Sequence, residues 1–294
     1  MNNILITGGN GFIGKYVVKN LLDNGYNPIV FDRYRHGDFE QMLGDTRDFT
    51  AVNEAVALVD GVIHLAGVLG TAETIDEPRP SVDTNIYGGL NIFQACKNYK
   101  KKCVYITVGN FWMDNSYSIT KNTAERFARM FNNEHGTEIA IVRALNAYGP
   151  LQKHSPVRKI IPNFIIPALK NEEITVYGDG SQIMDMVYVE NVADVLVRAL
   201  TVEHNQYDTN FEAGTGVRTT VQEIAETVIK LVGSGRIKNV PMRAGEPENS
   251  VVLGDPETLR PLYDGALPSL LSLEQGLTNT IPYFIDYLEG IEND

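Results

Sequence analysis

A tyrosine and a lysine four positions apart, Tyr117 and Lys121, are the side chains in this 294-residue chain best placed for proton transfer. Residues at i and i+4 share one face of a helix, and the apolar residues over 124–131 continue with helical spacing. An ammonium group beside a phenol, with another positive charge close by, lowers the pKa of the phenol. We therefore expect Tyr117 to act as a general base, although such a pair by itself more often marks a solvated helix face.

A glycine-rich turn near the amino terminus makes the catalytic interpretation stronger. The sequence TGGNGFIG lies between an apolar run at 4–7 and an amphipathic stretch at 12–22. Glycines allow a tight turn and a close backbone approach to pyrophosphate, and the free amides of a helix amino terminus attract its charge. The pattern predicts that a dinucleotide is held by Gly8, Gly11, Phe12, Ile13 and Gly14.

An acidic residue at the end of the next apolar run indicates which dinucleotide is bound. Asp32 can accept hydrogen bonds from both hydroxyls of an adenosine ribose. Arg33 and Arg35 follow and could hold a 2′-phosphate instead, but the carboxylate would repel that phosphate. The sequence favours NAD as cofactor over NADP.

The elements that must position these residues follow the rhythm of βαβ units. Apolar runs lie at 4–7, 28–32, 62–66, 104–108 and 139–144, separated by amphipathic stretches that include 12–22, 82–99 and 120–131. We expect an α/β fold: a Rossmann-like, doubly wound parallel sheet with a smaller carboxyl-terminal substrate-binding lobe. Residues 1–146 are assigned to the dinucleotide-binding domain and 147–294 mainly to the lobe, with segments around 185–214 returning to the first domain.

Composition excludes several other classes of protein. The chain is 43% hydrophobic and 21% charged, with no apolar run of about 20 residues, so no membrane segment is expected. No signal peptide is recognised, which predicts a cytoplasmic location. A net charge of −12 argues against nucleic acid as a partner. The histidines and the two cysteines lack metal-ligand spacing, so no metal site is expected, and motifs of hydrolases and kinases are missing.

Further motifs, in order along nearly the whole chain, resemble the NAD-dependent epimerase/dehydratase family, the extended branch of the short-chain dehydrogenases. Besides TGGNGFIG and the Tyr–Lys pair they are Gly44-Asp45-Thr46, His64-Leu65-Ala66-Gly67, Asn85 with Gly88, Arg143-x-x-Asn146-x-Tyr148-Gly149-Pro150, Val176-Tyr177-Gly178-Asp179-Gly180 and Arg243-Ala244-Gly245-Glu246-Pro247.

The resemblance implies roles for these residues. Cofactor contacts are expected from Asp45, Thr46, Leu65, Ala66, Gly67 and Asn85, in addition to Arg33, Tyr117 and Lys121. Substrate contacts are expected from Asn146, Tyr177 and Arg243, the arginine on the diphosphate of a nucleotide-diphosphate sugar. Arg158 and Lys159 could assist this arginine, although ordinary surface charge is the favoured interpretation for both.

The resemblance also implies the chemistry. Tyr117 would remove a hydroxyl proton from the sugar while hydride passes to NAD, which gives a transient keto sugar. An epimerase similar to the UDP-glucose 4-epimerases would return the hydride to the other face of the ring. A nucleotide-sugar dehydratase, a keto-reductase and a catalytically silent NAD-binding sensor or scaffold are the alternatives. A homodimer formed through the helices around 85–99 and 117–131 is expected.

Three departures from the family pattern bear on the reaction. The usual Ser or Thr after the fifth strand falls on Val108, so Thr107 is the expected catalytic hydroxyl and Asn110 a further candidate. Gly109 and Asn110 stand where dehydratases carry an Asp-Glu pair, which favours epimerisation. Met184 replaces a common arginine, so that Arg243 must hold more of the diphosphate.

Overall fold

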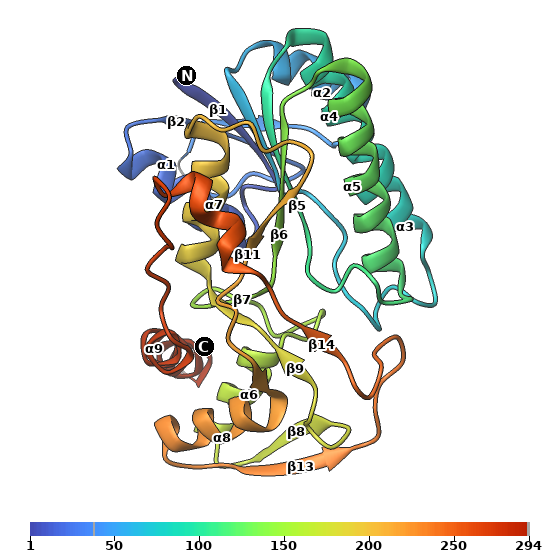
Figure 1. Cartoon of the computed structure of the whole chain (residues 1–294). Helices are drawn as coiled ribbons and strands as arrows, with labels where there is room; N and C mark the ends of the chain where they lie inside the picture. Colours follow the sequence, from blue (N-terminus) through green and yellow to red (C-terminus); the bar gives the residue numbers. More distant parts are fainter. Residues whose placement is uncertain (38, 293–294) are drawn as a thin grey trace.

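A parallel sheet forms the centre of the molecule in the computed structural model, which describes residues 1–37 and 39–292 (Figure 1). Its seven strands have the order β11-β6-β5-β4-β1-β2-β3, and every neighbouring pair is parallel. They are β1 Asn3–Thr7, β2 Asn27–Asp32, β3 Gln41–Leu43, β4 Gly61–His64, β5 Lys102–Val108, β6 Ile139–Ala144 and β11 Asn210–Ala213. The order changes direction between β1 and β4, and a doubly wound sheet binds its ligand beyond the carboxyl ends of strands at that point.

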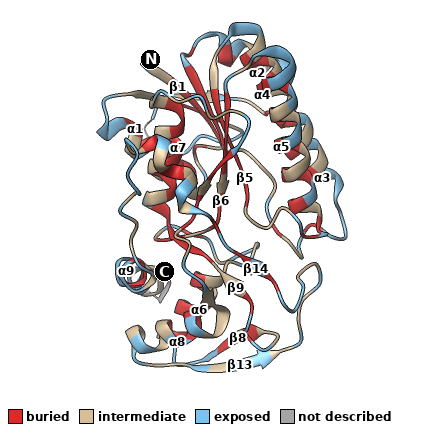
Figure 2. Cartoon of the chain, in the orientation of Figure 1, coloured by how far each residue is buried: buried red, intermediate tan, exposed pale blue. Residues whose placement is uncertain are grey.

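Helices cover both faces of the sheet, so its strands are buried on both sides (Figures 1 and 2). One layer comprises α1 Phe12–Asp23 and α7 Val189–Thr201, and the other comprises α2 Phe49–Ala57, α4 Gly88–Tyr99 and α5 Ser116–His135. Burial on two faces explains why the strands are continuous runs of Val and Ile and not alternating patterns. The expectation of a Rossmann-like sheet is confirmed.

The stretch expected to be one helix over 82–99 is divided. Residues Arg79–Ser81 form the short α3, Val82–Tyr87 form a π-helical turn, η1, and α4 begins at Gly88. The wider turn lies where the buried Asn85 side chain reaches back to the loop after β4. A π turn next to a ligand pocket is a frequent functional adjustment that residue periodicity does not reveal.

A smaller lobe lies beyond the carboxyl ends of the sheet strands (Figure 1). Its strands are β7 Asn146–Tyr148, β8 Glu173–Tyr177, β9 Ile183–Met184, β10 Met186–Tyr188, β12 Thr219–Thr220, β13 Arg236–Val240 and β14 Val251–Val252. Its helices are α6 Ile160–Leu169, α8 Val221–Val232 and α9 Leu273–Glu292, while the 3-10 helix η2 Pro256–Leu262 packs against β11. The lobe has its own apolar core, which includes Phe164, Ile174 and Ile224. Among the helices of the described residues, none combines the length and apolarity needed to cross a bilayer.

The chain passes between the two parts more than once. After β10 it returns to the sheet as α7 and then as β11, which pairs with β6. Asp185 stands at this crossing, fully buried, and its carboxylate accepts hydrogen bonds from the amides of Thr215, Gly216 and Gly254 at 2.9–3.1 Å. This residue therefore fixes three crossing segments relative to one another.

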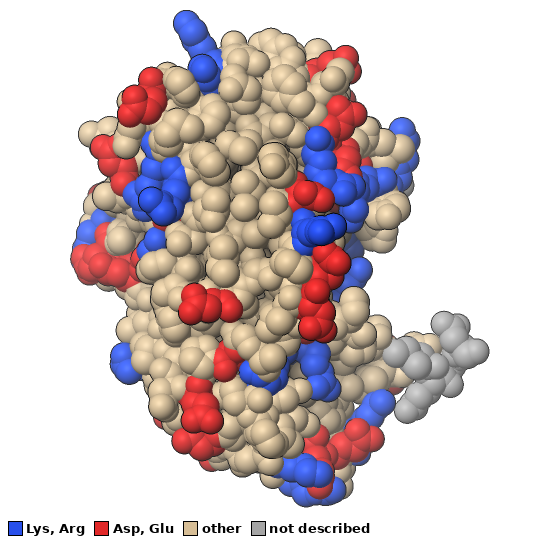
Figure 3. Space-filling model, turned by 90° about the vertical axis from the view of Figure 1, so that its right-hand side faces the viewer, with Lys and Arg blue, Asp and Glu red and all other residues tan. Residues whose placement is uncertain are grey.

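The face formed by α3, α4 and α5 leaves large apolar side chains exposed. Tyr87, Tyr99, Ile119 and Met130 are all accessible on it. Figure 3 shows this face: Lys, Arg, Asp and Glu side chains gather along its margins in the upper half of the molecule, with uncharged residues between them.

Candidate active site

The glycine turn between β1 and α1 forms an open amide cradle. Gly11 is the amino-terminal cap of α1, and no side chain caps the helix, so its first amides are free for a ligand. Gly8 has φ +70°, and a Cβ there would lie 2.9 Å from Ala66 Cα. At Gly14 a Cβ would lie 2.5 Å from the carbonyl oxygen of Gly8. Only glycine permits this packing, and the resulting cradle fits the pyrophosphate of NAD.

Asp32 stands at the end of β2, where it lines the same pocket as the glycine turn. Its carboxylate accepts hydrogen bonds from the amide of Arg33 at 2.7 Å and from the amide of Asn10 at 3.3 Å, which fix its position. Asp45 and Thr46 line the pocket beside it. Arg47 pairs with Asp45 at 2.6 Å and lowers the pKa of that carboxyl. The carboxylates at this end of the pocket can accept hydrogen bonds from ribose hydroxyls. The site therefore fits NAD better than NADP, whose ribose carries a phosphate.

The loop after β4 forms the opposite wall. Leu65, Ala66 and Gly67 line the pocket, and Ala66 donates its amide to the Thr7 hydroxyl at 3.2 Å. That hydroxyl also lies 2.6 Å from Nδ1 of the buried His64, whose pKa falls to about 3 through desolvation. His64 is therefore a neutral structural residue beneath the loop.

Asn85 supports this wall through hydrogen bonds. Its side chain is buried, accepts the amide of Val68 at 2.8 Å and donates to the Val68 carbonyl at 3.1 Å. It also donates to the Thr120 hydroxyl on α5 at 3.0 Å. Both hydrogens of its Nδ2 and one lone pair of its Oδ1 are used within the protein, and the lining of the cavity does not include Asn85, so its expected cofactor contact stays a prediction.

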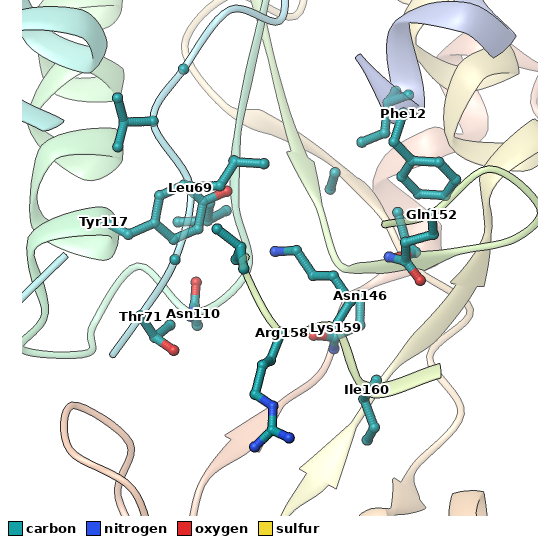
Figure 4. Close-up of a pocket in the computed structure, with 18 of the residues that line it drawn as sticks. Phe12, Leu69, Thr71, Asn110, Tyr117, Asn146, Gln152, Arg158, Lys159 and Ile160 are labelled. Carbon is teal, nitrogen blue, oxygen red and sulfur yellow. The ribbon is translucent and has the colours of Figure 1, made fainter. Parts of the chain in front are cut away.

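Tyr117 enters the pocket from the first turn of α5 (Figure 4). Asn115 caps this helix by accepting the amide of Ser118 at 2.9 Å, so the cap sets where the tyrosine projects. Lys121 lies one turn later, buried, with its ammonium 4.4 Å from the centroid of the Tyr105 ring. The predicted pair is thus brought to one face of one helix.

The expected lowering of the phenol pKa assumed a further positive charge beside the lysine and stays a prediction, while burial in the protein alone acts in the opposite direction. Desolvation raises the pKa of Tyr117 to about 12 and lowers that of Lys121 to about 7. The reason is that both groups are taken out of water, while the ammonium lies over Tyr105 and within the described residues no hydrogen bond joins it to the phenol. Activation of Tyr117 therefore requires additional positive charge in the pocket.

A buried glutamate next to Lys121 is a site residue that sequence reasoning missed. Glu125 is 2% exposed and accepts hydrogen bonds from Arg143 at 2.8 Å, Asn210 at 2.8 Å and Arg129 at 3.1 Å. Its charge raises the pKa of Lys121 against the effect of burial. The i, i+4, i+8 spacing of Tyr117, Lys121 and Glu125 was the signal that could have identified it.

The hydroxyl expected after β5 points to the helix. Thr107 is buried, and its Oγ1 lies 3.5 Å from the carbonyl oxygen of Lys121. Thr107 and Val108 both line the pocket, although neighbouring residues of a strand point to opposite faces. Asn110 also lines the pocket, and Figure 4 shows its side chain near Thr71, on the same side of the cavity as Tyr117.

The other end of the pocket belongs to the smaller lobe. Asn146, Tyr177 and Arg243 line it as expected from the sequence, and so do Gln152, Arg158 and Lys159. Arg243 lies 2.5 Å from Glu246 Oε1, with its guanidinium carbon 5.5 Å from the centroid of the Tyr177 ring. Its Nε is buried without a hydrogen-bond partner among the described residues. The favoured interpretation of Lys159 as ordinary surface charge is wrong, because this side chain extends into the cavity (Figure 4).

One cavity of about 830 Å³ joins these parts. It runs from the glycine turn past Tyr117 to Arg243 in the lobe. This volume is near the upper end of the roughly 300–1,000 Å³ of ligand pockets. The arrangement can hold a dinucleotide at one end and a second anionic ligand at the other, with a tyrosine at their junction.

Known proteins of one family share this sequence and architecture. The model of the family described as NAD dependent epimerase/dehydratase matches residues 4–214. The chain is 29% identical, over 99% of its length, to the UDP-N-acetyl-alpha-D-glucosaminuronate decarboxylase of Bacillus cytotoxicus, of which 98% is covered. It is 30% identical to the putative UDP-glucose 4-epimerase of Methanocaldococcus jannaschii, over 78% of this chain and 82% of that one.

A solved structure extends the similarity to three dimensions. The UDP-glucose 4-epimerase of Thermotoga maritima, crystallised with UDP-glucose, matches with a TM-score of 0.86 and 28% identity. The match covers 97% of this chain and 99% of the epimerase. The smaller lobe is therefore part of the shared architecture.

Proposed function

The chain belongs to the NAD-dependent epimerase/dehydratase family of enzymes that act on nucleotide sugars, and we propose that it is an epimerase that works through a transient keto sugar. The observation that carries the proposal is the single cavity in which Tyr117 lies between the NAD cradle and the Arg243 end of the lobe. We assign Tyr117, Lys121 and the glycine turn to the reaction, and Asn146, Tyr177 and Arg243 to the sugar nucleotide.

The residues around the sugar would divide the work as follows. Tyr117 takes the proton of a ring hydroxyl and later returns it, and Lys121 supplies positive charge behind the phenol. Bound NAD supplies the hydride acceptor and donor. Arg243 would hold the diphosphate while the ring turns over within the site. Asn110 is placed to orient the ring, because Val108 cannot hydrogen-bond.

The carboxylates of the pocket favour epimerisation over dehydration. Those that line it are Asp32, Asp45, Glu172, Glu173 and Glu246, near the cofactor end or in the lobe. The loop after β5 contributes Gly109, Asn110 and Met113 to the lining, while its acid, Asp114, is exposed and does not line the cavity. Expulsion of water from the sugar needs a nearby acid, which this loop does not provide.

Decarboxylation is the second candidate function. It is supported by the 29% identity, along 99% of the chain, to a decarboxylase of a nucleotide-linked uronic acid. Oxidation of such a sugar at the carbon β to its carboxylate would give a β-keto acid; loss of carbon dioxide would leave an enolate that takes up a proton, so no acid is needed to expel a leaving group. The same cavity could therefore perform either reaction, and the substrate would decide between them.

A panel of UDP, dTDP and GDP sugars incubated with the NAD-loaded enzyme tests the proposal, with products identified by mass spectrometry and NMR. Unchanged mass with one inverted carbon is the expected result. Loss of carbon dioxide would establish the decarboxylase, loss of water a dehydratase, and net oxidation or reduction of nicotinamide a dehydrogenase or keto-reductase.

The variant Tyr117→Phe separates an enzyme from a silent NAD-binding protein. It keeps the ring and removes the hydroxyl, so we expect turnover to fall by at least about a hundredfold while NAD remains bound. Turnover that is unaffected by this change would contradict the assigned base. If no sugar of the panel reacts with the unsubstituted chain, the sensor or scaffold alternative is favoured.

A further inference from the structure

Lys159 places an ammonium in the cavity without a protein counter-ion. It precedes α6 as the amino-terminal cap residue and is partly buried. Figure 4 shows its side chain extending into the cavity toward the side where Tyr117 and Asn110 lie. Among the described residues, its ammonium has neither a hydrogen bond nor an ion pair. An enclosed ammonium with no partner is a poor structural element and a good site for an anion.

The two acids nearest to Lys159 already have other partners. Glu73 Oε1 accepts the amide of Arg158 at 3.1 Å and lies 3.9 Å from Arg243 Nη1. Glu246 Oε1 lies 2.5 Å from Arg243 Nη2 and accepts the Thr71 hydroxyl at 2.7 Å. Burial is the largest effect on the pKa of Lys159 and lowers it, while the charges of Glu73 and Glu246 raise it and that of Arg243 lowers it.

The two arginines form a separate group around Tyr177. Arg158 donates from Nη1 to the Tyr177 hydroxyl at 2.6 Å, and Arg243 lies over the ring of the same tyrosine. Figure 4 shows the guanidinium of Arg158 and the ammonium of Lys159 pointing in different directions. A diphosphate bound at the arginines therefore leaves Lys159 free for a different anionic group of the same ligand.

We propose that Lys159 makes the site selective for a nucleotide sugar whose ring carries a carboxylate, a nucleotide-linked uronic acid. The inference rests on the proposed function, because it assumes that the sugar lies between Tyr117 and the lobe. The sugar ring must lie beside Tyr117, and Lys159 reaches toward that part of the cavity. Of the groups on a nucleotide sugar, only the diphosphate and a sugar carboxylate carry the negative charge that an ammonium selects.

Ligands that differ only in these anionic groups test the proposal. UDP, UDP-glucose and UDP-glucuronate share the diphosphate, and only UDP-glucuronate has the carboxylate. Affinities are measured by titration calorimetry on the NAD-loaded chain with Tyr117→Phe, which prevents turnover. We expect UDP-glucuronate to bind more tightly than UDP-glucose. Lys159→Gln should weaken UDP-glucuronate roughly 10- to 100-fold and leave the other two within about twofold.

Lys153→Gln is the matched control, because it removes the same charge from an exposed lysine of the same segment that does not line the cavity. It should change none of the three affinities. Equal weakening of all three ligands by Lys159→Gln would assign the lysine to the diphosphate and overturn the proposal. The proposal would also be overturned if Lys159→Gln left the affinity for UDP-glucuronate unchanged, or if UDP-glucuronate failed to bind the Tyr117→Phe chain.

The panel of nucleotide sugars distinguishes failure of the Lys159 inference from failure of the epimerase proposal. If Lys159-dependent selectivity for UDP-glucuronate is found but the unsubstituted enzyme only removes carbon dioxide, the inference stands and the epimerase proposal fails. If the enzyme epimerises UDP-glucose and Lys159→Gln has no effect on any affinity, the epimerase proposal stands and the inference fails.

Discussion

Glu125 extends the Tyr–Lys pair into a line of three titratable side chains on one face of α5. The groups that face the Lys121 ammonium are Glu125 and Tyr117 from its own helix, Tyr105 from β5 and the neutral His64 from β4. Of these only Glu125 is negatively charged near neutral pH, and hydrogen bonds from Arg129, Arg143 and Asn210 hold it in place. Glu125 is therefore a positioning residue that keeps Lys121 charged.

Replacing Glu125 by Gln should move the pH dependence of turnover to lower pH. Lys121 has a pKa of about 7 and is charged below it, so activity that needs the ammonium is lost as pH rises through that value. Removing the glutamate charge lowers this pKa further, and the alkaline loss of activity begins earlier. We also expect the free energy of unfolding to fall by about 2 kcal/mol, because hydrogen bonds to a buried charge are weakened.

Glu212→Gln is the control for this pH profile. Glu212 pairs with the same Arg143 at 3.4 Å but lies on β11, and it contributes nothing to the pKa of Lys121. Its loss should lower stability without shifting the alkaline limb. A Glu125→Gln profile that coincides with the unsubstituted enzyme would refute the electrostatic role.

Residues in local motifs could be predicted from the sequence, whereas residues defined by packing could not. The glycine turn and Asp32 are fixed by strand and helix ends, so their spacing alone indicated a common pocket. Glu125 and Lys159 depend on what the fold buries around them. Burial also determines the pKa of Tyr117 in the protein alone, because desolvation raises it to about 12.

At the scale of elements, the start of α5 connects the two ends of the cavity. Asn115 is buried, caps the helix through its oxygen and donates from Nδ2 to the carbonyl of Gly245 at 3.3 Å. Gly245 has φ +78° and lies in the loop that carries Arg243 and Glu246. One asparagine thus positions both the helix turn of Tyr117 and the arginine loop.

Asn115→Ala should reduce turnover more than stability. Loss of a helix cap costs about 1 kcal/mol of unfolding free energy, which thermal or urea denaturation measures. Turnover should fall at least about tenfold, because a small displacement of reacting groups is costly in rate. Thr220→Ala removes the equivalent cap of α8, at a half-buried position, and should cost similar stability with little change in turnover. Equal effects of both variants on turnover would show that Asn115 acts only through stability.

The short strands of the lobe show where element prediction fails. The sheet strands β1, β2, β5 and β6 coincide with apolar runs of Val and Ile, because both faces are buried. In contrast β9, β12 and β14 have two residues each and exist through their pairing with distant partners. No periodicity can reveal a strand of that length.

At the scale of the whole molecule, a net charge of −12 coexists with three cations at one end of the cavity. Arg158, Lys159 and Arg243 all line it, so a small anion finds a local positive site on a protein that repels polyanions at long range. The negative net charge of the chain is therefore compatible with the proposed binding of a nucleotide sugar.

The α4 and α5 face is proposed as the contact between two copies of the chain, because Ile119 and Met130 on α5 are exposed and Figure 3 shows uncharged residues between charged margins on this face. Light scattering after gel filtration should give twice the 32.6 kDa of one chain. Ile119→Glu should reduce the mass to that of the monomer, because a charge is then buried against an apolar surface. Leu22 is the control position, because it is 47% exposed, nearly as much as Ile119 at 49%, but lies on α1 on the other side of the sheet. Leu22→Glu should leave the dimer intact, and a monomeric unsubstituted chain at micromolar concentration would reject this contact.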